Sequence, residues 1–148
     1  MLIAEKLGPA AVAGTIVLEG SGLSRENRIT ANTLSAWLAA MHHEPDVRAM
    51  YQSTLPTKDG KLAKRFTLDS IEHDVIAKTG TINHVRCLSG YVTDPETGRT
   101  ATFSILCNGL TSGQSIRAAY RLQAAIIDAI DNNMSELALP EEQPVLGG

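Results

Sequence analysis

The sequence predicts one α+β domain in which helices pack on an antiparallel, three-stranded meander. Two segments, residues 85–93 and 99–108, alternate apolar and polar side chains and flank a hairpin-forming turn at residues 94–98. The segment 112–133 instead repeats apolar residues at the spacing of one helix face. The chain has 148 residues, of which 43% are hydrophobic and 20% are charged, and this is enough for one buried core.

Before the strands, the sequence predicts a short helix and a turn-rich loop. Residues 2–7 predict a helix that Gly8-Pro9 ends, and residues 15–18 predict a short buried strand. Glycine and serine turn formers then fill residues 19–28. Such a loop is typical either of plain surface or of a site held on a rigid scaffold.

Two further helices are expected after this loop. Thr30 is suited to cap the first, whose apolar residues recur at i, i+3, i+4 and i+7, namely Leu34, Trp37, Leu38 and Met41. The second is expected at residues 46–53, after Pro45, and Leu55-Pro56 ends it.

The predicted sheet begins with a strand at residues 75–78, which lies at or near an edge beside the two alternating segments. The helix at 112–133 packs on this sheet through one apolar stripe, formed by Ile116, Tyr120, Ile126, Ile127 and Ile130. We assign residues 1–139 to the domain and residues 140–148 to a disordered tail.

Charge and residue spacing argue against several classes of protein. The net charge is −3, and the one basic run, residues 58–65, has only Phe66 nearby for stacking, so a solvated loop and short helix are favoured over a nucleic-acid site. His42 and His43 have no third ligand at a suitable spacing, so we expect no metal and no cofactor. No apolar run is long enough for a membrane span, and residues 1–7 do not form a signal peptide. If Met1 is the natural start, we therefore expect the protein to remain in the cytoplasm.

One stretch, Ala77-Lys78-Thr79-Gly80-Thr81, has the composition of a serine acyl-transfer site. Lys78 offers a positive charge and Thr79 a hydroxyl to a substrate carboxylate. Gly80 lets a substrate backbone approach the strand, and the backbone N–H of Thr81 is suited to a developing oxyanion. A strand end with an exposed lysine is the plainer interpretation of the triplet when it is taken alone.

Other short motifs accompany this stretch in a fixed order along the chain. They are residues 19–25 followed by Asn27, Leu55-Pro56, Asp59-Gly60 with Arg65, residues 77–81, residues 88–91, and residues 103–106 with Asn108. The set resembles the D-alanyl-D-alanine carboxypeptidase family of low-molecular-mass, class C penicillin-binding proteins, over roughly residues 15–133.

The resemblance implies a penicillin-recognising, β-lactamase-like fold, present here only in its C-terminal part. It implies cleavage of the terminal D-alanine of peptidoglycan peptides, in some members cleavage of cross-links, acylation by penicillins, and a place in the periplasm or cell envelope. Ser24 resembles the serine of the second motif, which moves the proton to the leaving group. Asn27 is our choice for the amide that orients the substrate, although Glu26 occupies the position two residues after the serine. Lys78, Thr79 and Gly80 correspond to the third motif.

The chain departs from the family pattern in one respect. The family's nucleophile is the serine of a Ser-x-x-Lys motif, and no serine in this chain is followed by lysine at the third position. We therefore expect the isolated chain to be inactive. The alternatives are a binding module that holds a peptide carboxylate or pairs with a complementary N-terminal chain, and a generic α+β domain with coincidental motifs.

Two further expectations concern the apolar surface left by a missing central helix and the state of the two cysteines. Its loss uncovers apolar surface on the order of several hundred Å², worth roughly 10 kcal/mol at about 25 cal/mol per Å², so we expect self-association, pairing with a complementary chain, or marginal folding. In an oxidising envelope, Cys87 and Cys107 on neighbouring strands either form a bond or are two small buried core residues.

Overall fold

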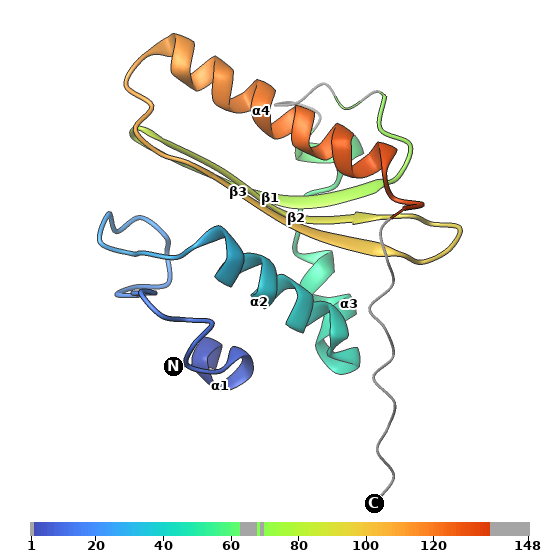
Figure 1. The fold of residues 1–148 in the computed structure, drawn as a ribbon, viewed down its shortest axis with the longest axis horizontal. Coiled ribbons are helices and arrows are strands. Elements are labelled where there is room, and N and C mark those ends of the chain that lie inside the picture. The colour runs from blue at the N-terminus through green and yellow to red at the C-terminus, as the bar shows by residue number, and fades with distance from the viewer. Residues whose placement is uncertain (1, 63–67, 69, 137–148) are drawn as a thin grey trace, which may run out of the picture.

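The computed structural model describes residues 2–62, 68 and 70–136. Its sheet consists of β1 (Asp74–Ile82), β2 (Val85–Thr93) and β3 (Thr100–Cys107), antiparallel and in that order. Figure 1 shows α4 (Gly113–Asn132) over one face of the sheet and α2 (Ala31–His43) under the other. The predicted α+β meander packed by helices is confirmed, with β1 as an edge strand.

Three short elements complete the described part of the chain. Helix α1 (Leu2–Leu7) packs against α2, and α3 (Pro45–Ser53) follows α2 directly (Figure 1). The segment η1 (Lys58–Leu62) is a short helical turn kinked at Gly60. The basic run predicted to be a loop and short helix therefore begins with such a turn, while its residues 63–65 lie outside the described residues, as does the tail 140–148.

Local sequence signals explain where the long elements begin and end. Ser112 caps α4 with a reciprocal capping box, because its Oγ accepts from the Ser115 N–H and the Ser115 hydroxyl oxygen accepts from the Ser112 N–H. Thr30 caps α2 through its side-chain oxygen, which accepts from the Thr33 N–H at 3.0 Å, as the sequence predicts. In the β2–β3 turn, the Asp94 carboxylate accepts from the Glu96 and Thr97 N–H groups.

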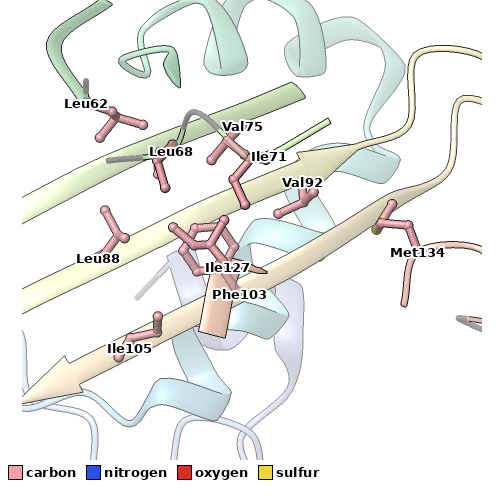
Figure 2. Packing of buried hydrophobic residues seen from close by; sticks show 11 residues of the cluster. Leu62, Leu68, Ile71, Val75, Leu88, Val92, Phe103, Ile105, Ile127 and Met134 are labelled. Carbon is pink, nitrogen blue, oxygen red and sulfur yellow. The ribbon is translucent and has the colours of Figure 1, made fainter. Parts of the chain in front are cut away.

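The main hydrophobic core lies between the sheet and α4. Figure 2 shows side chains from all three strands directed toward Ile127 of α4, which is fully buried. Buried apolar surface of this kind contributes about 25 cal/mol per Å². The buried members of this core are Leu62, Leu68, Ile71, Val75, Ala77, Leu88, Val92, Phe103, Ile105, Ile127 and Met134.

The opposite face of the sheet is tied to α2 by a buried tyrosine. Tyr91 is fully buried, and its hydroxyl donates to the Leu38 carbonyl of α2 at 2.8 Å. Burial raises the pKa of Tyr91, so the hydroxyl stays a neutral donor. Beside it, the hydroxyls of Ser89 and Ser104 lie 2.9 Å apart across β2 and β3. This face is therefore more polar than the α4 face.

The buried strand predicted at residues 15–18 is wrong. Ile16 and Arg28 form a single isolated bridge, and Ile16, Val17 and Leu18 are 43%, 47% and 61% exposed. Three apolar residues in succession, Ile16, Val17 and Leu18, are buried only if another element covers them. Here the segment folds back on the rest of its own loop, and one bridge does not bury it.

Residues 75–78 were predicted as the first strand, but β1 is longer and extends to Ile82. Ile82 pairs with Val85, so Asn83 and His84 form a two-residue turn into β2. The Lys78 stretch therefore lies in the middle of a strand and not at a strand end.

The register of β2 and β3 decides the arrangement of the cysteines. Cys87 pairs with Leu106, whereas Cys107 pairs with Arg86. Because side chains alternate between faces, Cys87 and Cys107 point to opposite faces of the sheet, and both are free. The suggestion that they bond is therefore wrong. The alternative interpretation expects both cysteines to be buried in the core, but each is only half-buried.

Candidate active site

The Lys78 stretch is positioned by backbone hydrogen bonds on both sides of β1. On the inner side, residues 78–81 pair with residues 86–89 of β2. On the outer side, the Ala77 N–H donates to the Pro56 carbonyl at 2.9 Å. Since successive residues of an antiparallel strand point their N–H groups in opposite directions, the N–H groups of Thr79 and Thr81 also face the outer edge. This is the edge along which an extended peptide can lie.

The side chain of Lys78 is exposed and curls back toward this same outer edge. Its ammonium donates to the Thr79 carbonyl at 2.8 Å. Such a local hydrogen bond to an exposed carbonyl is readily exchanged for a carboxylate, which forms a stronger, charge-assisted bond.

Gly80 has a structural role in addition to the predicted one. A Cβ at Gly80 would lie 3.2 Å from the Cβ of Cys87, its partner on β2. The absence of a side chain therefore gives Cys87 room, whether or not a substrate approaches from the other direction.

The predicted residues Ser24 and Asn27 lie in a loop organised by Glu19. The Glu19 carboxylate accepts from the Ser21 N–H at 2.6 Å and from the Ser24 N–H at 2.7 Å. Hydrogen bonds from the Ser21 side chain and the Ser24 backbone lower the pKa of Glu19 to about 2. Sequence reasoning missed Glu19, although an acid two residues before a Ser-Gly turn is a pattern that indicates such a side-chain cap.

The side-chain amide of Asn27 forms its hydrogen bonds within the loop. Its Oδ1 accepts from the Leu18 N–H at 2.9 Å, and its Nδ2 donates to the carbonyl and carboxylate of Glu19, both at 3.2 Å. The Ser24 hydroxyl oxygen accepts from the Glu26 N–H at 3.2 Å, which leaves its own hydrogen able to rotate toward a ligand. A substrate-orienting role for Asn27 stays a prediction, and it requires the amide to exchange one of these partners.

A cleft of about 710 Å³ separates this loop from the end of the sheet. Ser24 and Asn27 line it, whereas Lys78, Thr79, Gly80 and Thr81 do not. The two halves of the predicted site therefore do not share one cavity. They adjoin through Ile82, which lines the cleft and directly follows Thr81 in the chain. The cleft is lined by Ile16, Val17, Gly22, Ser24, Arg25, Asn27, Arg28, Ile29, Ile82, Asn83, His84, Val85, Cys87, Leu106, Asn108 and Gly109.

Two opposite charges fix the segment that leads into β1. The Lys58 ammonium donates to the carbonyls of Ile71, Glu72 and His73 at 3.1, 3.3 and 2.7 Å. The Asp131 carboxylate, at the end of α4, accepts from the N–H groups of Glu72 and His73 at 3.2 and 3.0 Å. It also contacts the His73 ring at 2.8 Å.

Asp131 stays ionised in this arrangement. Burial opposes its ionisation, but the hydrogen bonds from His73 and Glu72 outweigh burial, and the pKa of Asp131 is lowered. Sequence reasoning did not find this connection, because Lys58 and Asp131 are far from residues 71–73 in the chain. Together, the contacts of Lys58 and Asp131 with residues 71–73 fix the start of β1, the strand that carries Lys78.

Among the described residues, no group of three or more His, Cys, Asp or Glu side chains is arranged to hold a metal ion. His42 contacts Gln52 through Nδ1 at 3.1 Å, and burial together with Arg48 and His43 lowers its pKa. Within the same part of the chain, no helix is both long and apolar enough to cross a bilayer.

Comparison with known proteins supports the fold and identifies the family. The sequence profile of the D-Ala-D-Ala carboxypeptidase 3 (S13) family matches residues 4–131. The chain belongs to this family.

The similar proteins are much longer than this chain. A D-alanyl-D-alanine carboxypeptidase from Actinomadura sp. (strain R39) is 36% identical over 133 residues, which cover 85% of this chain and 23% of that protein. The crystal structure of penicillin binding protein 4 (dacB) from Haemophilus influenzae matches with a TM-score of 0.61 at 26% identity, covering 77% of this chain and 27% of the other. The same H. influenzae protein complexed with a β-lactam matches in fold with a TM-score of 0.62 at 24% identity, over 78% of this chain and 28% of that one. This chain thus spans about a quarter of the length of the relatives it matches.

Proposed function

We propose that this chain is the substrate-holding part of a serine-type D-Ala-D-Ala carboxypeptidase or endopeptidase of the cell envelope. In this role it binds the C-terminal carboxylate of a peptidoglycan peptide, or the carboxylate of a β-lactam, at Lys78. The Thr79 hydroxyl shares the carboxylate, and the backbone N–H of Thr81 is directed at the oxyanion.

The observation that carries the proposal is the geometry of β1. An exposed ammonium and two N–H groups lie on the outer edge of one strand, and that strand is fixed by β2, by Pro56 and by the contacts of Lys58 and Asp131. A site that stabilises charge needs donors that are held in place before the reaction begins. The β-lactam complex of the related H. influenzae protein supports the choice of ligand.

The same chain lacks the group that would react. Acyl transfer needs a nucleophile and a base together with oxyanion donors, and no serine here has a lysine three residues later. We propose that Ser24 assists proton transfer to the leaving group and is not acylated. The 148-residue chain alone should therefore bind substrate without turning it over.

Labelling and binding experiments on the purified chain test this proposal. We expect no covalent adduct with a fluorescent penicillin and no release of D-alanine, because there is no activated serine. NMR titration with an N-acylated D-Ala-D-Ala dipeptide should shift the amide signals of Thr79 and Thr81. Lys78→Ala should abolish these shifts, and Lys6→Ala, which removes an exposed lysine from α1, should not. Stoichiometric labelling of a serine would refute the inactive assignment.

A second measurement tests the catalytic value of the lysine. In a complete enzyme of the family, replacing the lysine equivalent to Lys78 by alanine should lower kcat/KM by roughly tenfold to a thousandfold, or about 1.4–4 kcal/mol. The fold should survive, because an exposed side chain with one local hydrogen bond contributes little stability. An unchanged kcat/KM would reject the role.

A second candidate function is pairing with a complementary polypeptide or self-association. It is favoured by one observation: Ile16, Val17, Leu18 and Leu23, all in the loop beside the cleft, are between 43% and 70% exposed. Light scattering with urea unfolding tests it. A cooperative monomer that binds no hydrophobic dye would count against this candidate and leave the carboxylate-binding proposal standing.

A further inference from the structure

The two edges of the sheet differ in how they are protected (Figure 1). At the β1 edge, the Ala77 N–H is taken up by Pro56, Thr57 bridges to Ile76, and Lys78 adds an exposed charge. Strand β3 contains no charged residue and no proline, and within the described part of the chain its outer side has no backbone hydrogen bond. Charges, prolines and covering segments are what keep edge strands from pairing. The β3 edge is therefore open to another strand.

The strand register shows which peptide groups of β3 face this open edge. The Ala77 N–H points away from β2, and Ala77 pairs with Gly90, so the peptide groups of Gly90 face β3. Gly90 pairs in turn with Phe103, which therefore bonds back to β2. Because successive residues alternate, the residues whose N–H and C=O groups face the open edge are Thr102, Ser104 and Leu106.

The shape and charge of β3 suit pairing with an identical strand. It pairs one-to-one with β2 from Thr100 to Cys107, so no bulge twists its edge away, and six of its eight residues are partly exposed. The neighbouring charge, on Arg99, is engaged within its own copy, because the guanidinium donates to the carbonyls of Met134 and Ser135 at 3.4 and 2.7 Å. Two uncharged strands laid side by side have no like charges to repel each other.

We propose that β3 pairs antiparallel with β3 of a second copy of this chain, about a two-fold axis that places Ser104 opposite Ser104. In this register the outward-facing groups of the two strands bond to each other. Phe103 of each copy lies opposite Ile105 of the other, and an aromatic residue paired with a β-branched one stabilises antiparallel strands. The two three-stranded sheets become one continuous sheet, with α4 of both copies on the same face.

The length of β3 sets the expected strength of this contact. Eight residues at about 3.4 Å each give a strand of about 27 Å, and one strand edge buries less than the roughly 1,000 Å² of a stable interface. We therefore expect a weak dimer, with a Kd on the order of 10–100 μM. The contact lies at the opposite edge of the sheet from Lys78, so the proposal does not depend on the carboxypeptidase assignment.

Sedimentation velocity and NMR on the 148-residue chain test the pairing. Between about 5 and 500 μM the chain should change from monomer to dimer. Over the same range, the amide signals of Thr102, Ser104 and Leu106 should shift and exchange more slowly with solvent. Shifts gathered at residues 16–23 would assign association to the exposed loop, and shifts at residues 77–81 would assign it to the β1 edge. Either result, or a monomer throughout, would overturn the proposal.

Matched variants separate edge pairing from general association. Thr102→Pro removes an outward N–H without removing a bond to β2, and Thr102→Lys adds a charge to the edge, so each should weaken dimerisation about tenfold or more. Ala118→Lys, which adds the same charge to the exposed side of α4, should not. Circular dichroism checks the fold, and Thr102→Lys decides if Thr102→Pro unfolds. Unchanged dimerisation of Thr102→Lys would overturn the proposal.

A cross-link tests the register. Ala101 of one copy should lie opposite Cys107 of the other in a non-hydrogen-bonded pair, with Cα atoms about 4.5 Å apart, which a disulfide can span. With oxidised glutathione, Cys87→Ser/Ala101→Cys should therefore give a covalent dimer, and adding Cys107→Ser should prevent it. The two positions are six residues apart on one extended strand, so they cannot bond within one copy. A variant that dimerises without cross-linking would overturn the register that the proposal requires.

Discussion

The two parts of the candidate site are held in different ways. The Lys78 strand is fixed by main-chain bonds to β2 and Pro56, and its own side chains contribute little to holding it. The Ser24 loop has a single backbone bridge, between Ile16 and Arg28, and is held mainly by the side chains of Glu19 and Asn27. A strand held by its backbone tolerates side-chain changes, whereas a loop held by two side chains does not.

This difference suggests a division of roles. The strand can present Lys78 and the N–H groups of Thr79 and Thr81 with little reorganisation, as preorganised donors require. The loop is able to rearrange if Asn27 exchanges a partner, so it is the part of the site that can respond to a ligand or to acid.

The largest expected effect comes from disturbing the backbone of the strand pair. Gly90 of β2 lies opposite Ala77, and a Cβ there would be 2.1 Å from the Ile76 carbonyl oxygen and 2.6 Å from the Ala77 Cα. Because both neighbours are backbone atoms, we expect Gly90→Ala to destabilise the protein by about 3 kcal/mol or more in urea unfolding. Gly20→Ala, in the loop with open space around it, should change stability by less than about 0.5 kcal/mol. Similar values for the two variants would contradict the distinction between strand and loop.

Periodicity and turn composition allow the strand half to be predicted from the sequence. Alternation over residues 85–93, the turn at residues 94–98 and the apolar stripe of residues 112–133 are local patterns, and each element they predict is present. The full length of β1 was not predictable in this way, because residues 79–81 are polar or small and become a strand only by pairing with β2.

The loop half was less accessible to sequence reasoning. Residues 15–18 have the composition of a buried strand, but burial depends on a covering element that local sequence does not specify. The motif includes Glu19, Ser24 and Asn27, yet it did not indicate that the Glu19 carboxylate accepts from the Ser24 N–H and the Asn27 amide. The contacts of Lys58 and Asp131 with residues 71–73 were also missed, since they join distant segments.

Removing one side chain should loosen the loop while leaving the strand intact. Asn27→Ala deletes the acceptor for the Leu18 N–H and two donors to Glu19, so the free energy of opening the loop should fall by about 1–2 kcal/mol. Hydrogen exchange at the Leu18 and Asn27 amides measures this, and the amides of β1 serve as the internal reference. Asn108→Ala, an exposed asparagine of the same cleft, is the matched control and should have little effect. Equal loosening of the β1 amides would mean that loop and strand open together.

The smallest effect is expected from acid, and it should again separate the two regions. Hydrogen bonds lower the pKa of Glu19 from 4.5 to about 2 in the folded protein, so its stabilising contribution is complete above about pH 4.5 and is lost as the pH falls toward 2. The amide proton shifts of Ser21 and Ser24 should titrate with a midpoint near this value, while those of Lys78 to Thr81 should stay constant. Amides 72 and 73 must be followed separately, because the pKa of Asp131, which they contact, is also lowered. Glu19→Gln should remove the titration at Ser21 and Ser24 and leave the one at residues 72 and 73. A midpoint near 4.5 would show that the Glu19 carboxylate does not hold the loop in solution, and the positions of Ser24 and Asn27 would then need another cause.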